Sequence, residues 1–248
     1  MAIGIRDHFV EVEGIRSSCD NPVSKFPMDT SINPLRIARD VIVIGASAGG
    51  HRAVVELLSR LPEDLPAFVG VVIHRGALSK SNWSHTLGSK TKLRVVEPTN
   101  GEPLRRSVVY IAPSDCHMTF GDDCVSLDHQ AKEHFTRPAV DPLFVSAANA
   151  YGPRVVAVIL TGGGHDGMQG LLHVTRAGGL SIVQKPSEAP HASMPEYAIA
   201  HDHVRAVLTI DEIGDALVLL ARGCAVPLDA GGQIHRSDHR DTASRAVD

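Results

Sequence analysis

Apolar runs typical of buried strands alternate with amphipathic helical stretches along most of the chain. The run "VIVIGA" at residues 41–46 is continuous, as expected for a strand that a parallel sheet buries on both faces. The next stretch, "GGHRAVVELLSRLP", places its aliphatic residues on one helical face and stops at Pro62. A second apolar strand, "AFVGVVIH", follows at residues 67–74. A strand, a helix and a strand within about 30 residues predict a right-handed βαβ unit.

The middle of the chain interrupts this alternation. Residues 107–113 and 116–128 are typical of short antiparallel strands, and Gly121, Asp122 and Asp123 provide the turn of a β-hairpin. The alternation then resumes, with strands predicted at 155–161, 180–184 and 204–210 and helices at 142–152, 168–179, 195–202 and 211–223. The whole pattern predicts an α/β fold, a doubly wound, mostly parallel, Rossmann-like sheet with a β-hairpin insertion.

Both ends of the chain lack a sustained hydrophobic period. Residues 1–38 include "CDNPVSKFPMDTSINP" and are predicted to form an N-terminal arm or linker. Residues 224–248 are polar and are predicted to form a flexible C-terminal tail. The folded domain is therefore expected at residues 39–223. The arm is expected to be passive, because it has few apolar groups to offset the backbone entropy that ordering would cost.

Composition and charge exclude several classes of function. The 248 residues carry a formal net charge of −4 with Lys and Arg dispersed, which argues against nucleic-acid binding. No stretch reaches the ~18 apolar residues of a membrane span, and the first residues lack the apolar core of a signal peptide. The four cysteines form no CxxC pair, and Cys116 with His117 lacks the second pair that a zinc site needs. We expect reduced thiols, no metal and a cytoplasmic protein that acts on another protein or a small molecule.

Three chemically reactive side chains follow three predicted parallel strands. Ser47 comes after the first strand, His74 after the second, and Asp166 after the strand at 155–161. The carboxyl ends of parallel strands open onto one edge of the sheet, so these residues are expected to meet there. Acyl transfer uses such a set: a hydroxyl that attacks, an imidazole that takes its proton, and a carboxylate that fixes the imidazole tautomer.

Each residue also has a structural interpretation. Ser47 could cap the helix that follows it, which would contribute about 1 kcal/mol. His74 is one of fourteen histidines, most of which are expected to have no catalytic role. Asp166 could cap the helix that begins near Gly167. Placement of all three on one edge is what favours catalysis over these alternatives.

A nucleotide-binding interpretation competes for the same glycine-rich turn. The segment "GGGHDG" fits GxGxxG through Gly162, Gly164 and Gly167, and it follows a strand and opens a helix. However, the Asp166 carboxylate would lie where the pyrophosphate binds, and the two anions would repel. The next strand ends in Gln184 and Lys185, with no acid to bind a ribose hydroxyl. We therefore expect no nucleotide cofactor.

Six motifs, in order from about Val41 to Ile210, carry a resemblance to one family. They are "IGASAGG", "VVIH", "YIAPSDCHM", "RPAVDPLF", "VILTGGGHDG" and "SMPEYAI". The family is that of the chemotaxis protein-glutamate methylesterases, the CheB family. The segment "IGASAGG" resembles its nucleophile turn, "VVIH" its histidine strand and "YIAPSDCHM" its "YIAP-x-D-x-HM" hairpin. The segment "RPAVDPLF" resembles its "RPSVD-x-LF" segment, "VILTGGGHDG" its "ILTGMG-x-DG" loop and "SMPEYAI" its Met-Pro helix start. The resemblance covers essentially the whole predicted folded domain.

This resemblance implies an activity and roles for individual residues. It implies hydrolysis of γ-glutamyl methyl esters on the cytoplasmic helices of methyl-accepting chemoreceptors, with release of methanol, and in some members deamidation of receptor glutamines. Ser47 resembles the nucleophile, His74 the general base and Asp166 the orienting carboxylate; no cofactor is implied. The chain order Ser, His, Asp and the absence of GxSxG disfavour the α/β-hydrolase fold.

The sequence departs from the family pattern beside the nucleophile and in the glycine loop. Gly163 stands where the family usually has a Met whose N–H faces the oxyanion, and Ala48 replaces a Thr found in some members. Together with Gly164, these residues are expected to support the oxyanion site, and the freer backbone at Gly163 predicts a lower rate.

A second departure lies at the N-terminus. Many relatives carry a receiver domain of ~120 residues, and residues 1–38 are too few to form one. The sequence therefore predicts no control by phosphorylation within this chain. The alternative function is a non-catalytic, partner-binding module of a chemosensory complex. The complete set of Ser, His and Asp argues against that alternative, because binding alone needs none of them.

Overall fold

The computed structural model describes residues 37–76, 83–201 and 204–226. These residues form a seven-stranded, wholly parallel sheet and a separate two-stranded antiparallel sheet. The predicted arm, except for residues 37 and 38, and the predicted tail, except for residues 224–226, lie outside the described residues.

The parallel sheet is centred on the first strand of the sequence. Its strand order is β3 (Arg94–Val96), β4 (Val108–Ile111), β2 (Phe68–Ile73), β1 (Val41–Ala46), β7 (Val155–Ile159), β8 (Leu180–Gln184) and β9 (Ala206–Leu208). The chain winds outward from β1 in both directions, which makes the fold doubly wound, as predicted. Every residue of β1, β2 and β7 is buried, which explains their continuous apolar sequences.

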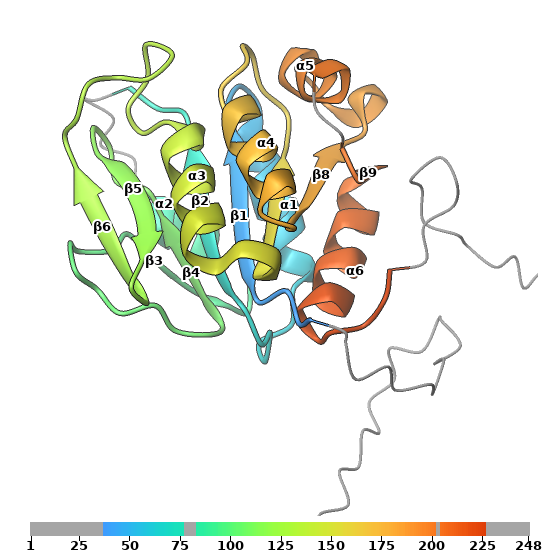
Figure 1. Ribbon diagram of the computed structural model, residues 1–248, viewed down its shortest axis with the longest axis horizontal. Coiled ribbons are helices and arrows are strands. Elements are labelled where there is room, and N and C mark those ends of the chain that lie inside the picture. The colour runs from blue at the N-terminus through green and yellow to red at the C-terminus, as the bar shows by residue number, and fades with distance from the viewer. Residues whose placement is uncertain (1–36, 77–82, 202–203, 227–248) are drawn as a thin grey trace, which may run out of the picture. The chain divides into compact units, whose positions relative to one another are not determined.

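Helices cover both faces of this sheet. In Figure 1, α3 (Val140–Tyr151) and α4 (Met168–Arg176) lie across the near face and contact each other. Behind the sheet, α1 (Gly50–Arg60) packs against α6 (Ile210–Ala221). The remaining helices are α2 (Trp83–Gly88), α5 (Ser193–His201) and the short 3₁₀ helices η1 (Gly152–Arg154) and η2 (Pro186–Glu188).

The predicted β-hairpin is present as β5 (His117–Gly121) and β6 (Cys124–Asp128), which pair antiparallel. Asp122 and Asp123 form its turn with φ of 50° and 56°, the left-handed geometry of a tight hairpin. Phe120 anchors the hairpin to the sheet, where its ring meets Phe68 edge-to-face at 5.6 Å. A Cβ at Gly70 would lie 2.6 Å from the Phe120 ring, so the absence of a side chain at residue 70 permits this packing.

The antiparallel pairing predicted for residues 107–113 was wrong. These residues form β4, which pairs parallel with β2 and β3 instead of joining the hairpin. The strand is only four residues long and wholly buried, so it lacks the alternation that separates antiparallel from parallel strands. The elements α2 and β3 were not predicted. The strand β3 has three residues, none of them fully buried, so it leaves no apolar run in the sequence.

Candidate active site

Neighbouring strands bring Ser47, His74 and Asp166 together at the carboxyl edge of the sheet. Ser47 follows β1, His74 follows β2, and Asp166 lies in the turn between β7 and α4. His74 Nδ1 is 3.1 Å from Ser47 Oγ, and His74 Nε2 is 2.6 Å from Asp166 Oδ2. The three residues expected from the strand ends therefore form one hydrogen-bonded chain.

The carboxylate determines which ring nitrogen of His74 faces the serine as an acceptor. An ionised carboxylate only accepts hydrogen bonds, so His74 Nε2–H donates to Asp166. The lone pair on His74 Nδ1 then faces the Ser47 hydroxyl. This is the arrangement that a general base needs in order to take the proton of a nucleophilic hydroxyl.

Asp166 is held by the first turn of α3. Its Oδ2 also accepts the Val140 N–H at 2.7 Å, and its Oδ1 accepts the Asp141 N–H at 3.0 Å. Burial alone would raise the pKa of Asp166, but the hydrogen bonds from His74 and from these backbone groups lower the pKa below its ordinary value. The carboxylate is therefore ionised and fixed in orientation at neutral pH.

The structure corrects both capping alternatives. The N-cap of α1 is Gly49, with no side-chain capping bond, so the Ser47 hydroxyl does not cap that helix. The N-cap of α4 is Gly167, also without a side-chain capping bond. Asp166 does cap a helix, but that helix is α3 and not the one that follows it in sequence. Sequence order gave the wrong helix because α3 and α4 pack together with their first turns adjacent, as the bond between Gly170 and Asp141 shows.

Asp141 forms the reciprocal contact, which the sequence analysis missed. It lies in the first turn of α3, where its Oδ1 accepts the Gly170 N–H of α4 at 2.7 Å and its Oδ2 lies 3.1 Å from His134 Nε2. Burial, with a contribution from the Asp166 charge, raises the pKa of Asp141. The only available signal was its position in the "RPAVDPLF" motif. Asp141 and Asp166 together fix α3 to α4 beside His74.

Replacing Asp141 by alanine is expected to destabilise the fold. The change leaves the buried Gly170 N–H without its acceptor, which should lower the free energy of unfolding by about 2 kcal/mol in urea denaturation. The matched control is Asp215→Ala at an exposed position of α6, where a change within about 0.5 kcal/mol is expected. Equal losses in the two variants would contradict the positioning role of Asp141.

The glycine turn after β7 lies directly against the serine. The Ser47 N–H donates to the Thr161 carbonyl at 3.0 Å, and the Thr161 hydroxyl donates to the Ala48 carbonyl at 3.1 Å. A Cβ at Gly162 would lie 2.8 Å from Ser47 Cβ, so this close approach requires glycine. Gly163 follows and is exposed, and within the described part of the chain its N–H has no hydrogen-bond acceptor.

The GxGxxG match of the sequence lies in the same turn. Asp166 points from the turn toward His74, and Gly164 has a φ of +84°, a geometry that favours glycine.

Among the described residues, His134, Asp141 and Asp166 offer metal-ligand atoms within 4.8 Å of one another. Hydrogen bonds to His74, to Gly170 and between His134 and Asp141 account for this group. No helix in the described ranges has the length and apolar character needed to cross a membrane.

Comparison with known proteins adds sequence and structural relatives. A family model described as CheB methylesterase matches residues 42–217. A protein-glutamate methylesterase/protein-glutamine glutaminase of Anaeromyxobacter dehalogenans is 40% identical over 190 residues, which are 76% of this chain and 56% of that protein. A putative enzyme of the same kind from Leptospira interrogans is 35% identical over 182 residues, which are 73% of this chain and 94% of that protein.

The similarity extends to three-dimensional structure. The crystal structure of the Thermotoga maritima CheB methylesterase catalytic domain matches with a TM-score of 0.69 at 33% sequence identity. The match covers 73% of this chain and 98% of the Thermotoga chain. By contrast, the chain spans little more than half the length of several relatives, with 56%, 52% and 52% of three of them covered.

Proposed function

The chain belongs to the CheB methylesterase family, and from this we propose that it is a serine esterase that hydrolyses γ-glutamyl methyl esters of chemoreceptors and releases methanol. Deamidation of receptor glutamines would use the same residues. The observation that carries the proposal is the position of His74, whose two ring nitrogens lie 3.1 Å from Ser47 Oγ and 2.6 Å from Asp166 Oδ2.

The proposed reaction has two steps at one serine. Ser47 Oγ attacks the ester carbonyl while His74 Nδ1 takes the hydroxyl proton, and the Asp166 carboxylate stabilises the resulting imidazolium. The C–O bond to the methoxy group then breaks, and methoxide leaves as methanol with the proton from His74. Water attacks the γ-glutamyl–Ser47 ester by the same proton path and yields glutamate and free Ser47.

The glycine turn supplies the proposed oxyanion site. The N–H of Gly163, for which no described residue provides an acceptor, lies in the turn that packs on Ser47, where it can donate to the oxygen of the tetrahedral intermediate. Removal of one such donor in serine hydrolases costs roughly 10²–10³ in kcat. Gly164 and Ala48 support the turn from either side: Gly164 through its left-handed backbone and Ala48 through its bond to Thr161.

Replacing Gly163 by methionine is expected to raise kcat by roughly twofold to fivefold. A Cβ at Gly163 meets no atom within 4 Å, so the side chain fits, and it restricts the backbone that holds the N–H. Replacing a glycine reduces the backbone entropy lost on folding by about 0.4–1 kcal/mol. We take the same entropy saving for holding this N–H in the transition state, and that saving corresponds to the stated rate factor. Gly121→Met, at an equally open site on the hairpin, is the matched control and should leave kcat unchanged. A fall in kcat for Gly163→Met alone would contradict this oxyanion assignment.

Methanol release from a methylated receptor fragment tests the proposed activity. Wild-type protein is expected to release methanol in proportion to the glutamate formed. The partner-binding alternative predicts binding of the fragment with no methanol above spontaneous hydrolysis.

We further propose that the chain acts in the cytoplasm, where the receptor helices lie. Its free thiols at Cys116, Cys124 and Cys224 suit a reducing compartment.

A further inference from the structure

The only tryptophan of the chain, Trp83, begins α2 and contacts two other elements. Its indole meets the His51 imidazole edge-to-face, with the ring centroids 5.5 Å apart. The Arg75 guanidinium lies over the same indole, with Cζ 5.0 Å from the ring centroid. The indole therefore joins the first turn of α1, which carries His51, to the segment that follows β2, which carries Arg75.

Both contacts of the indole lie close in sequence to the proposed catalytic pair. His51 is four residues after Ser47, and Arg75 directly follows His74. We call the side chains of His51, Trp83 and Arg75 the tryptophan bridge. The bridge connects the segment of the nucleophile to the segment of the general base through side chains that belong to neither.

Backbone hydrogen bonds between β1 and β2 fix these two segments at the strand ends. The His74 N–H donates to the Ala46 carbonyl at 3.0 Å. Beyond this bond the chain enters α1 on one side and continues to Arg75 on the other. Asp166 holds the His74 ring at Nε2, the nitrogen that faces away from Ser47. The distance from Nδ1 to Ser47 Oγ therefore also depends on how the two segments lie past the strand ends.

The Arg75 guanidinium has a fixed position of its own. Its side chain is 3% exposed, and Nη2 donates to the Ala112 carbonyl, just after β4, at 2.5 Å. Nη1 donates to the Glu97 carboxylate, just after β3, at 3.2 Å. These bonds anchor Arg75 to the two strands beyond β2, so the indole that contacts it rests on a fixed support.

Folding stability alone does not account for a buried arginine at residue 75. Its carboxylate partner, Glu97, is 33% exposed, and the buried Nε–H of Arg75 has no acceptor among the described residues. Burying an incompletely paired charge costs free energy, and apolar replacements of buried ion pairs are often neutral or stabilising. A contribution to the adjacent site accounts for a cation at this position.

We propose that Arg75 and Trp83 are positioning residues that hold His74 at hydrogen-bond distance from Ser47. This inference rests on the proposed function. The tryptophan bridge limits how far the nucleophile turn and the segment after β2 can separate, and a displacement of about 1 Å in such a pair costs roughly 10² in rate. Arg75 is too deeply buried to touch a substrate, so it acts through Trp83 and through its peptide bond to His74.

Arg75→Leu separates positioning from folding, because leucine removes the buried charge and keeps an apolar side chain. We measure the rate constant with which a fluorophosphonate modifies Ser47, and the fraction of molecules modified at the end of the reaction. The rate constant is expected to fall at least tenfold, while every molecule is still modified at the end. The melting temperature is expected to stay within about 3 °C of wild type.

Replacements of Trp83 test the other half of the bridge. Trp83→Leu removes the ring between His51 and Arg75 and is expected to lower the rate constant as much as Arg75→Leu does. Trp83→Phe keeps an aromatic ring for both contacts and is expected to stay within about threefold of wild type.

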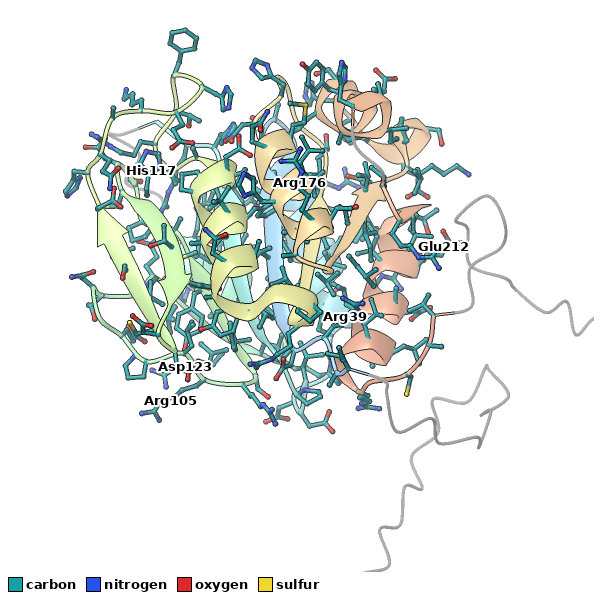
Figure 2. The ribbon with its side chains drawn as sticks, viewed as in Figure 1. Arg39, Arg105, His117, Asp123, Arg176 and Glu212 are labelled. Carbon is teal, nitrogen blue, oxygen red and sulfur yellow. The ribbon has the colours of Figure 1, made fainter. Side chains whose placement is uncertain are left out.

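The matched control is Tyr151→Leu, which also removes a ring that contacts an arginine. Arg154 Cζ lies 5.4 Å from the Tyr151 ring centroid, just before β7 and so at the amino-terminal edge of the sheet. The Tyr151 hydroxyl donates at 3.3 Å to Asp123, which is labelled at the lower end of the hairpin in Figure 2. This variant is expected to lower the melting temperature and to leave the rate constant within about twofold of wild type.

Three outcomes would contradict the inference. A rate constant for Arg75→Leu within about twofold of wild type, or an equal loss in Tyr151→Leu, would overturn the positioning role and leave the esterase proposal intact. A loss seen only as a smaller modified fraction would show that Arg75 and Trp83 serve folding alone. A wild-type protein whose Ser47 does not react would overturn the proposed nucleophile, and this inference with it.

Discussion

Ser47→Ala is expected to lower kcat for methyl-ester hydrolysis by about 10⁴-fold or more while the protein stays folded. The change removes the oxygen proposed to attack the ester, and His74, 3.1 Å away, then has no hydroxyl proton to take. The measurement is methanol release at saturating receptor fragment, with thermal melting as the test of folding. Because the Ser47 side chain makes no capping bond to α1, loss of its hydroxyl should cost little stability.

The matched control for this variant is Ser126→Ala. Ser126 is exposed on β6 of the hairpin, so its replacement should change neither kcat nor melting. Turnover by Ser47→Ala within tenfold of wild type, with unchanged melting, would show that Ser47 is not the nucleophile.

Asp166→Asn is expected to lower kcat by about 10⁴-fold and also to destabilise the protein by about 1–3 kcal/mol. The carboxylate accepts three hydrogen bonds, from His74, Val140 and Asp141. Asparagine has one acceptor oxygen, so its NH₂ group must face a donor, either on the ring or on the first turn of α3. The rate falls because the His74 tautomer is no longer fixed and its positive charge is no longer balanced.

Asp215→Asn on the surface of α6 is the control for Asp166→Asn, and it should change neither kcat nor the free energy of unfolding. A loss of stability with kcat preserved would mean that Asp166 serves α3 as a cap and does not act through His74. A loss of kcat with stability preserved would mean that the bonds to α3 contribute little.

Much of this architecture could be predicted from local sequence. The strands β1, β2 and β7 are continuous apolar runs followed by polar turns, so their identity and their polar end residues were readable without a structure. Parallel strands share one carboxyl edge, so the residues that follow these strands, Ser47, His74 and Asp166, could be expected to lie together. The shortest strands escaped this reasoning: β4 was assigned to the wrong sheet and β3 was not predicted.

The contacts that support the site were not predictable in the same way. The Asp166 bond to α3, the Asp141 bond to α4 and the ring contacts of His165 with His134 and Tyr197 all join segments that are distant in sequence. They depend on how α3 lies against α4 and on where the 129–138 loop meets the β7–α4 turn. Hydrophobic periodicity carries no information about these choices, since it identifies the buried face of a helix but not its neighbour.

Covalent labelling tests the central claim, an activated Ser47, most directly. A fluorophosphonate reacts with serines that an adjacent base activates, and peptide mass spectrometry identifies the modified residue. Wild-type protein is expected to carry the phosphonyl group on Ser47 alone, and His74→Ala should lose the labelling while remaining folded. Methanol release from the receptor fragment by a protein whose Ser47 resists labelling, or equal labelling of the His74→Ala variant, would contradict the account.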